Sequence, residues 1–168
     1  NFKAYFSYGN VFSQGMTPKN MYRSHNLNSK VDFKVLEHVF VDFSAKYSNQ
    51  YSKNQPAAGY LWNPLTGAYL VPRGTDWNYY KDNFEVYDAT RGCNIQNWTN
   101  TKQQQFGNPY WMLNRQTPIS ERNRYEFGGS VKWEITPDLN IQGRMRYERG
   151  DEHFIHNAYA SSVGDLYP

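Results

Sequence analysis

The sequence predicts an all-β fold of long antiparallel strands, because it contains two hairpins with the same pattern. From residue 124 to residue 135 the chain alternates between an apolar and a polar face without interruption. A short turn at Thr136-Pro137-Asp138 follows, and the alternation resumes over residues 139–148. A period of two residues is typical of strands, and two strands joined by a tight turn form an antiparallel hairpin.

The two faces of this hairpin differ strongly in charge. The apolar face carries no charged residue across both strands, whereas the polar face carries four basic and three acidic residues. The first strand spans roughly 33 Å, and a tilt of about 40° gives roughly 25 Å of height, which matches the apolar band of an outer-membrane barrel. Tyr125 and Tyr147 stand near one end of the band and Trp133 near the other, where rings favour membrane interfaces. A half-buried soluble hairpin also alternates, so this hairpin alone leaves both alternatives open.

A second hairpin nearer the N-terminus repeats the design. Residues 26–35 and 39–48 alternate around a short turn at Leu36-Glu37-His38, and residues 2–10 form a further strand. A basic residue on a lipid-facing surface costs about 2–4 kcal/mol near the middle of the bilayer. The absence of charge from the apolar face of two independent hairpins therefore favours a transmembrane β-barrel over a soluble sheet.

The strands and loops define a segment of a barrel and not a closed one. The predicted strands lie near residues 2–10, 24–35, 39–51, 122–135 and 139–150, and the predicted loops near residues 11–23, 52–121 and 151–168. Barrels place short turns on the periplasmic side and long loops outside, so we expect all three loops to be extracellular. Five strands cannot close, because the smallest common barrels need about eight and an open edge in lipid leaves backbone groups unsatisfied. We therefore expect about five strands of a larger antiparallel transmembrane β-barrel.

Composition excludes several other classes of protein. The mean hydropathy is −0.88, and no run of apolar residues is long enough for a transmembrane helix. The net charge of +3 is spread along the chain, which does not indicate a nucleic-acid partner. Cys93 is the single cysteine, so an internal disulfide is impossible. The sequence starts at Asn1 without a signal segment, and we expect the localisation signal elsewhere in a longer protein.

The long loop near residues 52–121 is rich in aromatic residues and holds the candidate contacts for a substrate. Rings stack on sugar faces or line peptide grooves at low entropic cost. The same rings also form the least costly core that a long loop can build, so both interpretations stay open. The candidate contacts are Trp62, Tyr69, Arg73, Asp76, Trp77, Tyr79, Trp98, Tyr110 and Trp111.

No pattern of catalytic or metal-ligating residues stands out, and we predict neither an enzyme nor a cofactor. The sequence shows no nucleophile with a matching base and no glycine-rich phosphate loop, and nothing indicates a pair of glycosidase carboxylates. His153 and His156 lie beside Asp151 and Glu152, but their spacing suits a metal site on a helix better than one in a loop.

Several motifs occur in a fixed order along nearly the whole chain. Asn63-Pro64-Leu65-Thr66-Gly67 is followed by Pro72-Arg73-Gly74, and then by Asn108-Pro109-Tyr110-Trp111. These segments resemble the NPLTG, PRG and NPYW loop signatures of the SusC/RagA-like TonB-dependent transporters in the outer membrane of Bacteroidetes. Residues 5–10, 122–125 and 139–144 resemble barrel strands of the same family.

The resemblance implies an energy-coupled importer in the Gram-negative outer membrane. Its substrates would be nutrients too large for porins, chiefly glycan oligomers, with peptides in the RagA branch. Its partners would be outer-membrane lipid, a SusD-like surface lipoprotein over the extracellular loops, and the TonB-ExbB-ExbD machinery acting on a plug domain that this sequence does not contain. The alternative is a soluble or surface-attached β-sandwich that binds carbohydrate. In that case the uncharged face must meet a second sheet, for which the chain supplies few strands.

Overall fold

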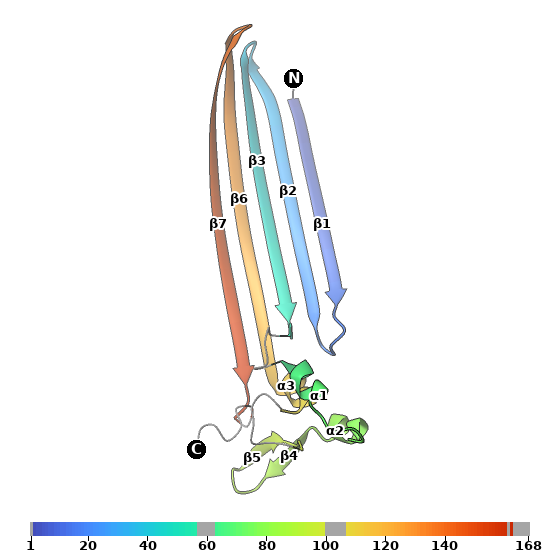
Figure 1. The fold of residues 1–168 in the computed structure, drawn as a ribbon. Helices are drawn as coiled ribbons and strands as arrows, with labels where there is room; N and C mark the ends of the chain where they lie inside the picture. The colour runs from blue at the N-terminus through green and yellow to red at the C-terminus, as the bar shows by residue number, and fades with distance from the viewer. Residues whose placement is uncertain (1, 57–62, 100–106, 161, 163–168) are drawn as a thin grey trace. The chain divides into compact units, whose positions relative to one another are not determined.

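The computed structural model describes residues 2–56, 63–99, 107–160 and 162, and these residues are mostly antiparallel β-sheet (Figure 1). This confirms the predicted all-β class. The chain divides into two compact units, which we describe separately. The sheet unit comprises the described residues among 1–13, 22–52 and 120–153, and the loop unit comprises those among 14–21, 53–119 and 154–168.

Five long strands form one open sheet. They are β1 (Phe2–Gln14), β2 (Met21–Leu36), β3 (Val39–Lys53), β6 (Gln116–Thr136) and β7 (Leu139–Ala158), in the order β1-β2-β3-β6-β7. The spatial order follows the chain order, so β1 and β7 lie at the two edges (Figure 1). Glu37-His38 and Pro137-Asp138 join β2 to β3 and β6 to β7, which confirms both predicted tight turns.

The strands extend beyond the residues that alternation predicts. β1 continues to Gln14, β6 begins at Gln116 and β7 ends at Ala158. This corrects the loops expected near residues 11–23, 52–121 and 151–168, because part of each is strand. The reason is physical: near Arg149 and Asp151 both faces of β7 carry polar residues, so the side-chain contrast disappears while backbone pairing continues.

The loop unit contains short regular elements where the sequence shows none. It holds the helices α1 (Pro64–Tyr69), α2 (Trp77–Asp82) and α3 (Pro109–Arg115). It also holds a separate antiparallel hairpin of β4 (Glu85–Asp88) and β5 (Cys93–Gln96). Elements of four to seven residues are too short to produce a periodic pattern, which explains why residues 52–121 look irregular in sequence.

The core of the described chain lies in the loop unit. The buried hydrophobic residues among those described are Trp98, Trp111, Met112 and Leu113, and all four belong to this unit. The apolar side chains of the sheet unit remain accessible instead. None of the helices in the described residues is long and apolar enough to cross a membrane.

Candidate functional site

The sheet unit has an apolar face that is open to its surroundings. Val131 of β6 is 49% exposed and Ile141 of β7 is 57% exposed, although both are aliphatic. A shallow apolar hollow on this face is lined from four adjacent strands, mainly by Val31, Phe33, Val41, Phe43, Phe127 and Val131. The apolar positions of β2, β3, β6 and β7 therefore share one face, as the alternation predicts.

This face changes from apolar to polar at a row of tyrosines. The rings of Tyr47 and Tyr125 lie 4.9 Å apart on β3 and β6. The hydroxyl of Tyr47 donates to Oδ1 of Asn123 at 2.9 Å. Two residues further along β3 and on the same face, Asn49 donates to Asn123 at 2.8 Å and to Glu121 at 3.1 Å. The rings therefore separate apolar side chains on one side from amides and a carboxylate on the other.

The neighbouring strands show the same transition. On β1 and β2, the Tyr8 hydroxyl and Nδ1 of His25 form a hydrogen bond of 2.7 Å. On β7, the exposed Tyr147 is followed by Arg149, which donates to Asp151 at 3.2 Å. The boundary between apolar and polar surface thus crosses the sheet and does not belong to one strand.

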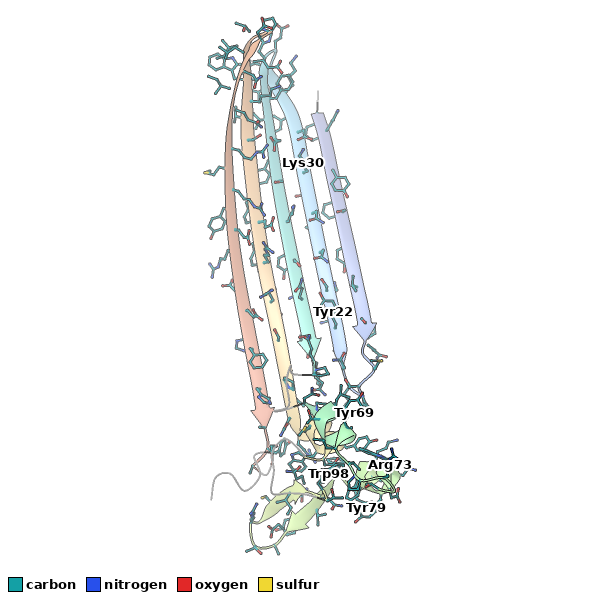
Figure 2. The ribbon with its side chains drawn as sticks, in the orientation of Figure 1. Tyr22, Lys30, Tyr69, Arg73, Tyr79 and Trp98 are labelled. Atoms are coloured by element: carbon teal, nitrogen blue, oxygen red, sulfur yellow. The ribbon has the colours of Figure 1, made fainter. Side chains whose placement is uncertain are left out.

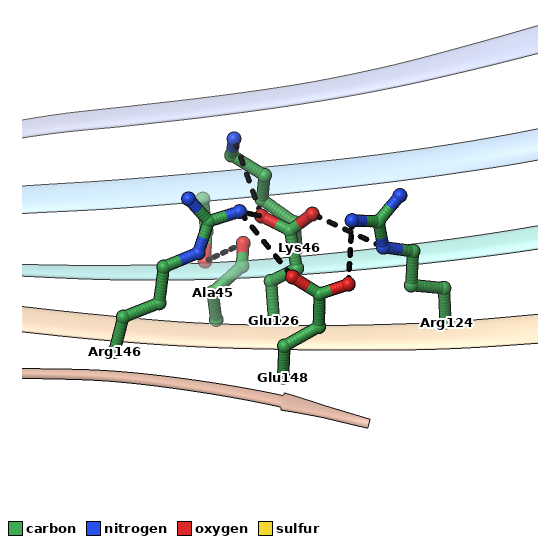
Figure 3. A network of polar contacts seen from close by, with 7 residues as sticks. Ala45, Lys46, Arg124, Glu126, Arg146 and Glu148 are labelled. Carbon is green, nitrogen blue, oxygen red and sulfur yellow. Dashed lines mark hydrogen bonds and ion pairs between the residues drawn. The ribbon is translucent and has the colours of Figure 1, made fainter. Parts of the chain in front are cut away.

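The opposite face of the sheet carries a network of paired charges (Figure 3). Glu126, whose side chain is 17% exposed, lies among three cations: Arg146 at 2.9 Å, Arg124 at 3.4 Å and Lys46 at 3.6 Å. Glu148 pairs with Arg124 at 2.5 Å and with Arg146 at 3.6 Å. Further pairs on this face are Lys30–Asp32, Lys132–Glu134 and Arg122–Glu152. The charges predicted for the polar face therefore lie together and neutralise one another in part.

In the loop unit, the Asn-Pro motifs begin helices. The side chain of Asn63 accepts a hydrogen bond from the backbone N–H of Leu65 at 3.0 Å, and Pro64 occupies the first turn of α1. Asn108 and Pro109 do the same for α3, with Tyr110 as donor at 2.9 Å. Asparagine at the N-cap followed by proline in the first helical turn is a common helix start. These motifs therefore set the shape of the unit.

Asn108 is also the polar centre of the loop unit. Its side chain has no exposed surface, and its amide nitrogen donates to the carbonyls of Asn97 at 2.8 Å and Tyr80 at 3.2 Å. Its backbone N–H donates to Oε1 of Gln96 at 3.1 Å. Asn108 thus ties α3 to α2 and to the end of β5. The sequence analysis did not predict that Asn108 joins these elements. The Pro109 that follows it was the available signal, because proline is common in the first turn of a helix.

Four of the candidate contacts gather in one aromatic cluster. Trp77 lies 5.9 Å from Trp98 and 6.4 Å from Tyr110, measured between ring centroids. Tyr80 lies 5.1 Å from both Trp98 and Tyr79. Edge-on and tilted rings at these separations stabilise each other by about 0.5–1.5 kcal/mol per pair. The cluster therefore contributes to the core of the loop unit as well as to its surface.

Two candidate contacts are buried and form core. Trp111 has no exposed surface, and its indole Nε1 donates to Oγ of Ser162 at 3.0 Å. Trp98 is 7% exposed within the aromatic cluster. The sequence left open whether these rings contact a ligand or form the core of the loop. The burial of Trp98 and Trp111 favours the core.

The remaining candidates divide between capping and exposed surface. Asp76 is the N-cap of α2, where it accepts from Asn78 at 3.0 Å. Tyr69 is 85% exposed at the end of α1, and Arg73 and Tyr79 are also exposed (Figure 2). Trp62 lies outside the described residues. Tyr69, Arg73 and Tyr79 are therefore the exposed candidates that do not cap a helix.

A bidentate ion pair fastens the β4–β5 hairpin to α3. Nε and Nη2 of Arg115 donate to the two carboxylate oxygens of Glu85 at 2.8 and 2.7 Å. The guanidinium also lies 4.9 Å from the ring centre of Tyr159. Hydrogen bonds from Arg115 lower the pKa of the Glu85 carboxyl, and Glu85 raises the pKa of Arg115. The two residues are thirty positions apart in the chain, and no local sequence pattern indicates that they pair.

The described residues do not form a metal site. No group of three or more His, Cys, Asp and Glu side chains in this part of the chain is placed to hold an ion. His153 and His156 lie in β7 and not in a loop, so side chains three positions apart point to opposite faces of the strand.

Comparisons with protein-family models, with curated proteins and with solved structures found no match for this chain. The resemblance to SusC/RagA-like transporters therefore stays a prediction. We base the function on the two faces of the sheet unit.

Proposed function

We propose that this chain supplies part of the barrel wall and extracellular surface of an active nutrient importer in the bacterial outer membrane. One observation supports the membrane assignment above all others. The sheet has an exposed, uncharged apolar face that ends at a row of tyrosines, and its opposite face carries a network of paired charges.

The energetics of the two faces favour lipid on one side and water on the other. Monomeric soluble proteins rarely expose a continuous apolar patch of more than a few hundred Å². Exposure of apolar side chains such as Val131 and Ile141 to water is unfavourable, whereas their contact with lipid hydrocarbon is not. The charged network needs an aqueous side, because a basic residue facing the middle of the bilayer costs about 2–4 kcal/mol. A barrel wall provides both environments.

The lengths of the strands agree with this arrangement. A tilted transmembrane strand needs about 9–11 residues, and the five strands have 13 to 21 residues each. The surplus residues lie on the polar side of the tyrosine row, where β6 and β7 carry Glu121, Arg149 and Asp151. These strands would continue out of the hydrocarbon into the lipid headgroups and water.

The import activity is supported by the resemblance of the loop motifs to SusC/RagA-like transporters. In that assignment the solute is a glycan oligomer or a peptide, a SusD-like lipoprotein covers the extracellular loops, and TonB-ExbB-ExbD acts on a plug domain. Tyr69, Arg73 and Tyr79 are the accessible side chains for a solute or for this lid.

Extraction and gel mobility test the membrane assignment. The full-length protein should require detergent for extraction from an outer-membrane fraction, and its gel mobility should change on boiling, as a barrel unfolds. Release by high salt and alkaline carbonate, with unchanged mobility, would contradict the proposal and favour the soluble carbohydrate-binding sandwich. Import is tested separately by the uptake of labelled oligosaccharides with and without a protonophore, since TonB-coupled uptake should stop without the proton gradient.

A further inference from the structure

The polar face of the sheet unit contains a hollow of about 300 Å³ between β2, β3, β6 and β7. Its floor has little side-chain volume, because Gly128 has no side chain and its neighbour Ser44 is small. A β-carbon added at Gly128 would lie 2.9 Å from Oγ of Ser44, so the Ser44 side chain already packs over this glycine. Both residues line the hollow, and a larger side chain at Gly128 would collide with Ser44.

The charges around the hollow are unbalanced. Four basic and two acidic side chains line it, which leaves a surplus of two positive charges. The residues are Lys30, Lys46, Arg144, Arg146, Asp42 and Glu126. Basic groups lining a water-filled passage with low-dielectric walls attract anions and select for them.

Several of these side chains already have partners on the same face. Arg146 and Lys46 both contact Glu126, at 2.9 and 3.6 Å. Lys30 pairs with Asp32 at 2.9 Å, and Asp42 accepts a hydrogen bond from Ser130. These contacts fix the rim of the hollow and occupy both of its acidic groups.

Arg144 differs from the other cations of the rim. Its exposed side chain makes no hydrogen bond or ion pair within the part of the chain that the structure describes. A guanidinium has five donors in a planar fork that matches a carboxylate. Arg144 therefore lies on the edge strand β7 with its donors free of the described residues, beside a hollow with surplus positive charge.

A second hollow of about 210 Å³ lies on the same polar face and shares two lining residues with the first, Lys46 and Glu126. Its lining adds two further cations, Arg122 and Arg124, and neutral groups that include the amides of three side chains, Asn26, Asn28 and Gln50. Amides donate and accept hydrogen bonds, as the hydroxyls of a sugar do. One face thus presents two adjoining hollows with surplus positive charge, and amides line the second of them.

We propose that this face binds acidic oligosaccharides, with a sugar carboxylate held by Arg144 in the hollow at Gly128. This inference rests on the proposed function and names the substrate class of the importer. Neighbouring sugar hydroxyls would meet the amides of the second hollow. The sheet would therefore favour uronate-type oligomers over neutral ones of the same size.

Calorimetric titration of the full-length protein in detergent tests the site. The ligands are trigalacturonate and its fully methyl-esterified form, which keeps the hydroxyls but loses the charge. The wild type should bind the acid on the order of tenfold more tightly, as expected for one charge-assisted hydrogen-bonded pair. Arg144→Gln should abolish this preference, and Arg144→Lys should restore part of it.

Lys34→Gln is the matched control, because it removes one positive charge from the same face outside both hollows. It should keep most of the preference for the acid. Equal binding of acid and ester, binding of neither, or equal losses in Arg144→Gln and Lys34→Gln would each overturn the proposal. So would an Arg144→Gln protein that unfolds at lower temperature but keeps the preference, since Arg144 would then pair within the protein.

The site and the membrane assignment fail independently. A detergent-requiring, heat-modifiable protein without preference for the acid would leave the barrel assignment intact and remove the carboxylate site. A protein that is released without detergent but still shows Arg144-dependent binding would keep the carboxylate site and remove the barrel assignment.

Discussion

The rings of Tyr47 and Tyr125 lie 4.9 Å apart across β3 and β6, and the Tyr47 hydroxyl donates to Asn123 at 2.9 Å. The ring bodies continue the apolar face, while the hydroxyl meets an amide at its polar end. Tyrosine takes this arrangement at membrane interfaces because its ring is apolar and its tip is polar. The pair therefore marks where we expect hydrocarbon to end on this sheet.

Arginine on the apolar face should prevent membrane assembly. Val131→Arg and Ile141→Arg each place a charge on the surface that we assign to lipid, at a cost of about 2–4 kcal/mol near the middle of the bilayer. We expect less heat-modifiable protein in the outer-membrane fraction for both variants.

Asn140→Arg provides the control, because Asn140 precedes Ile141 on β7 and points to the opposite, polar face. It should assemble like the wild type. Similar losses for Asn140→Arg and Ile141→Arg would mean that the assignment of faces is wrong.

The sheet was predictable from sequence because the patterns that indicate its strands and turns lie within short stretches of the chain. Alternation with a period of two residues and a two-residue turn such as Pro137-Asp138 need no knowledge of distant contacts. The strand ends were not predictable, because pairing continues past Tyr147 after the apolar pattern stops. The helices of the loop unit, at six or seven residues, are shorter than two turns and gave no periodic signal.

The candidate contacts show a different limit of sequence reasoning. Composition placed Tyr69 and Trp111 in the same aromatic loop, but one is 85% exposed and the other has no exposed surface. Burial depends on which segments return to cover a ring, and for Trp111 the covering residue is Ser162, far along the chain. The pairing of Arg115 with Glu85 was hidden for the same reason.

Trp111→Ala should destabilise the loop unit, whereas Tyr69→Ala should not. Loss of a buried tryptophan costs about 3–5 kcal/mol, and a surface substitution usually costs less than about 0.5 kcal/mol. We expect faster proteolysis within residues 53–119 for Trp111→Ala in the assembled protein. If Tyr69 contacts the solute or the lid, Tyr69→Ala should lower uptake at unchanged protease resistance. Equal protease resistance of the two variants would contradict the assignment of Trp111 to the core.

Gly67→Ala should disturb the packing of α1 near the start of α3. A β-carbon at Gly67 would lie 2.4 Å from the carbonyl oxygen of Gly107, and backbone cannot yield as a side-chain tip can. Such overpacking typically costs about 1–3 kcal/mol. The thermal unfolding midpoint of the loop unit should fall, whereas Gly9→Ala has open space around it and should leave the midpoint unchanged. An unaltered Gly67→Ala midpoint would show that α1 moves aside at little cost.

The ion pair between Glu85 and Arg115 should make the loop unit sensitive to acid. Arg115 lowers the pKa of Glu85 below its ordinary value of 4.5, so the pair stabilises the folded state fully above that value. The stabilisation is lost as the pH falls through the lower, folded-state pKa. The urea midpoint of the loop unit should stay level from neutral pH to about 5 and decrease below it.

Glu85→Gln tests this assignment. The variant should have a lower urea midpoint at pH 7, and its midpoint should decrease much less than that of the wild type below about pH 5. A smaller slope should persist, because the backbone N–H of Thr90 lowers the pKa of Asp88 in the same hairpin. A Glu85→Gln protein with the full acid-dependent decrease would show that other carboxylates control it.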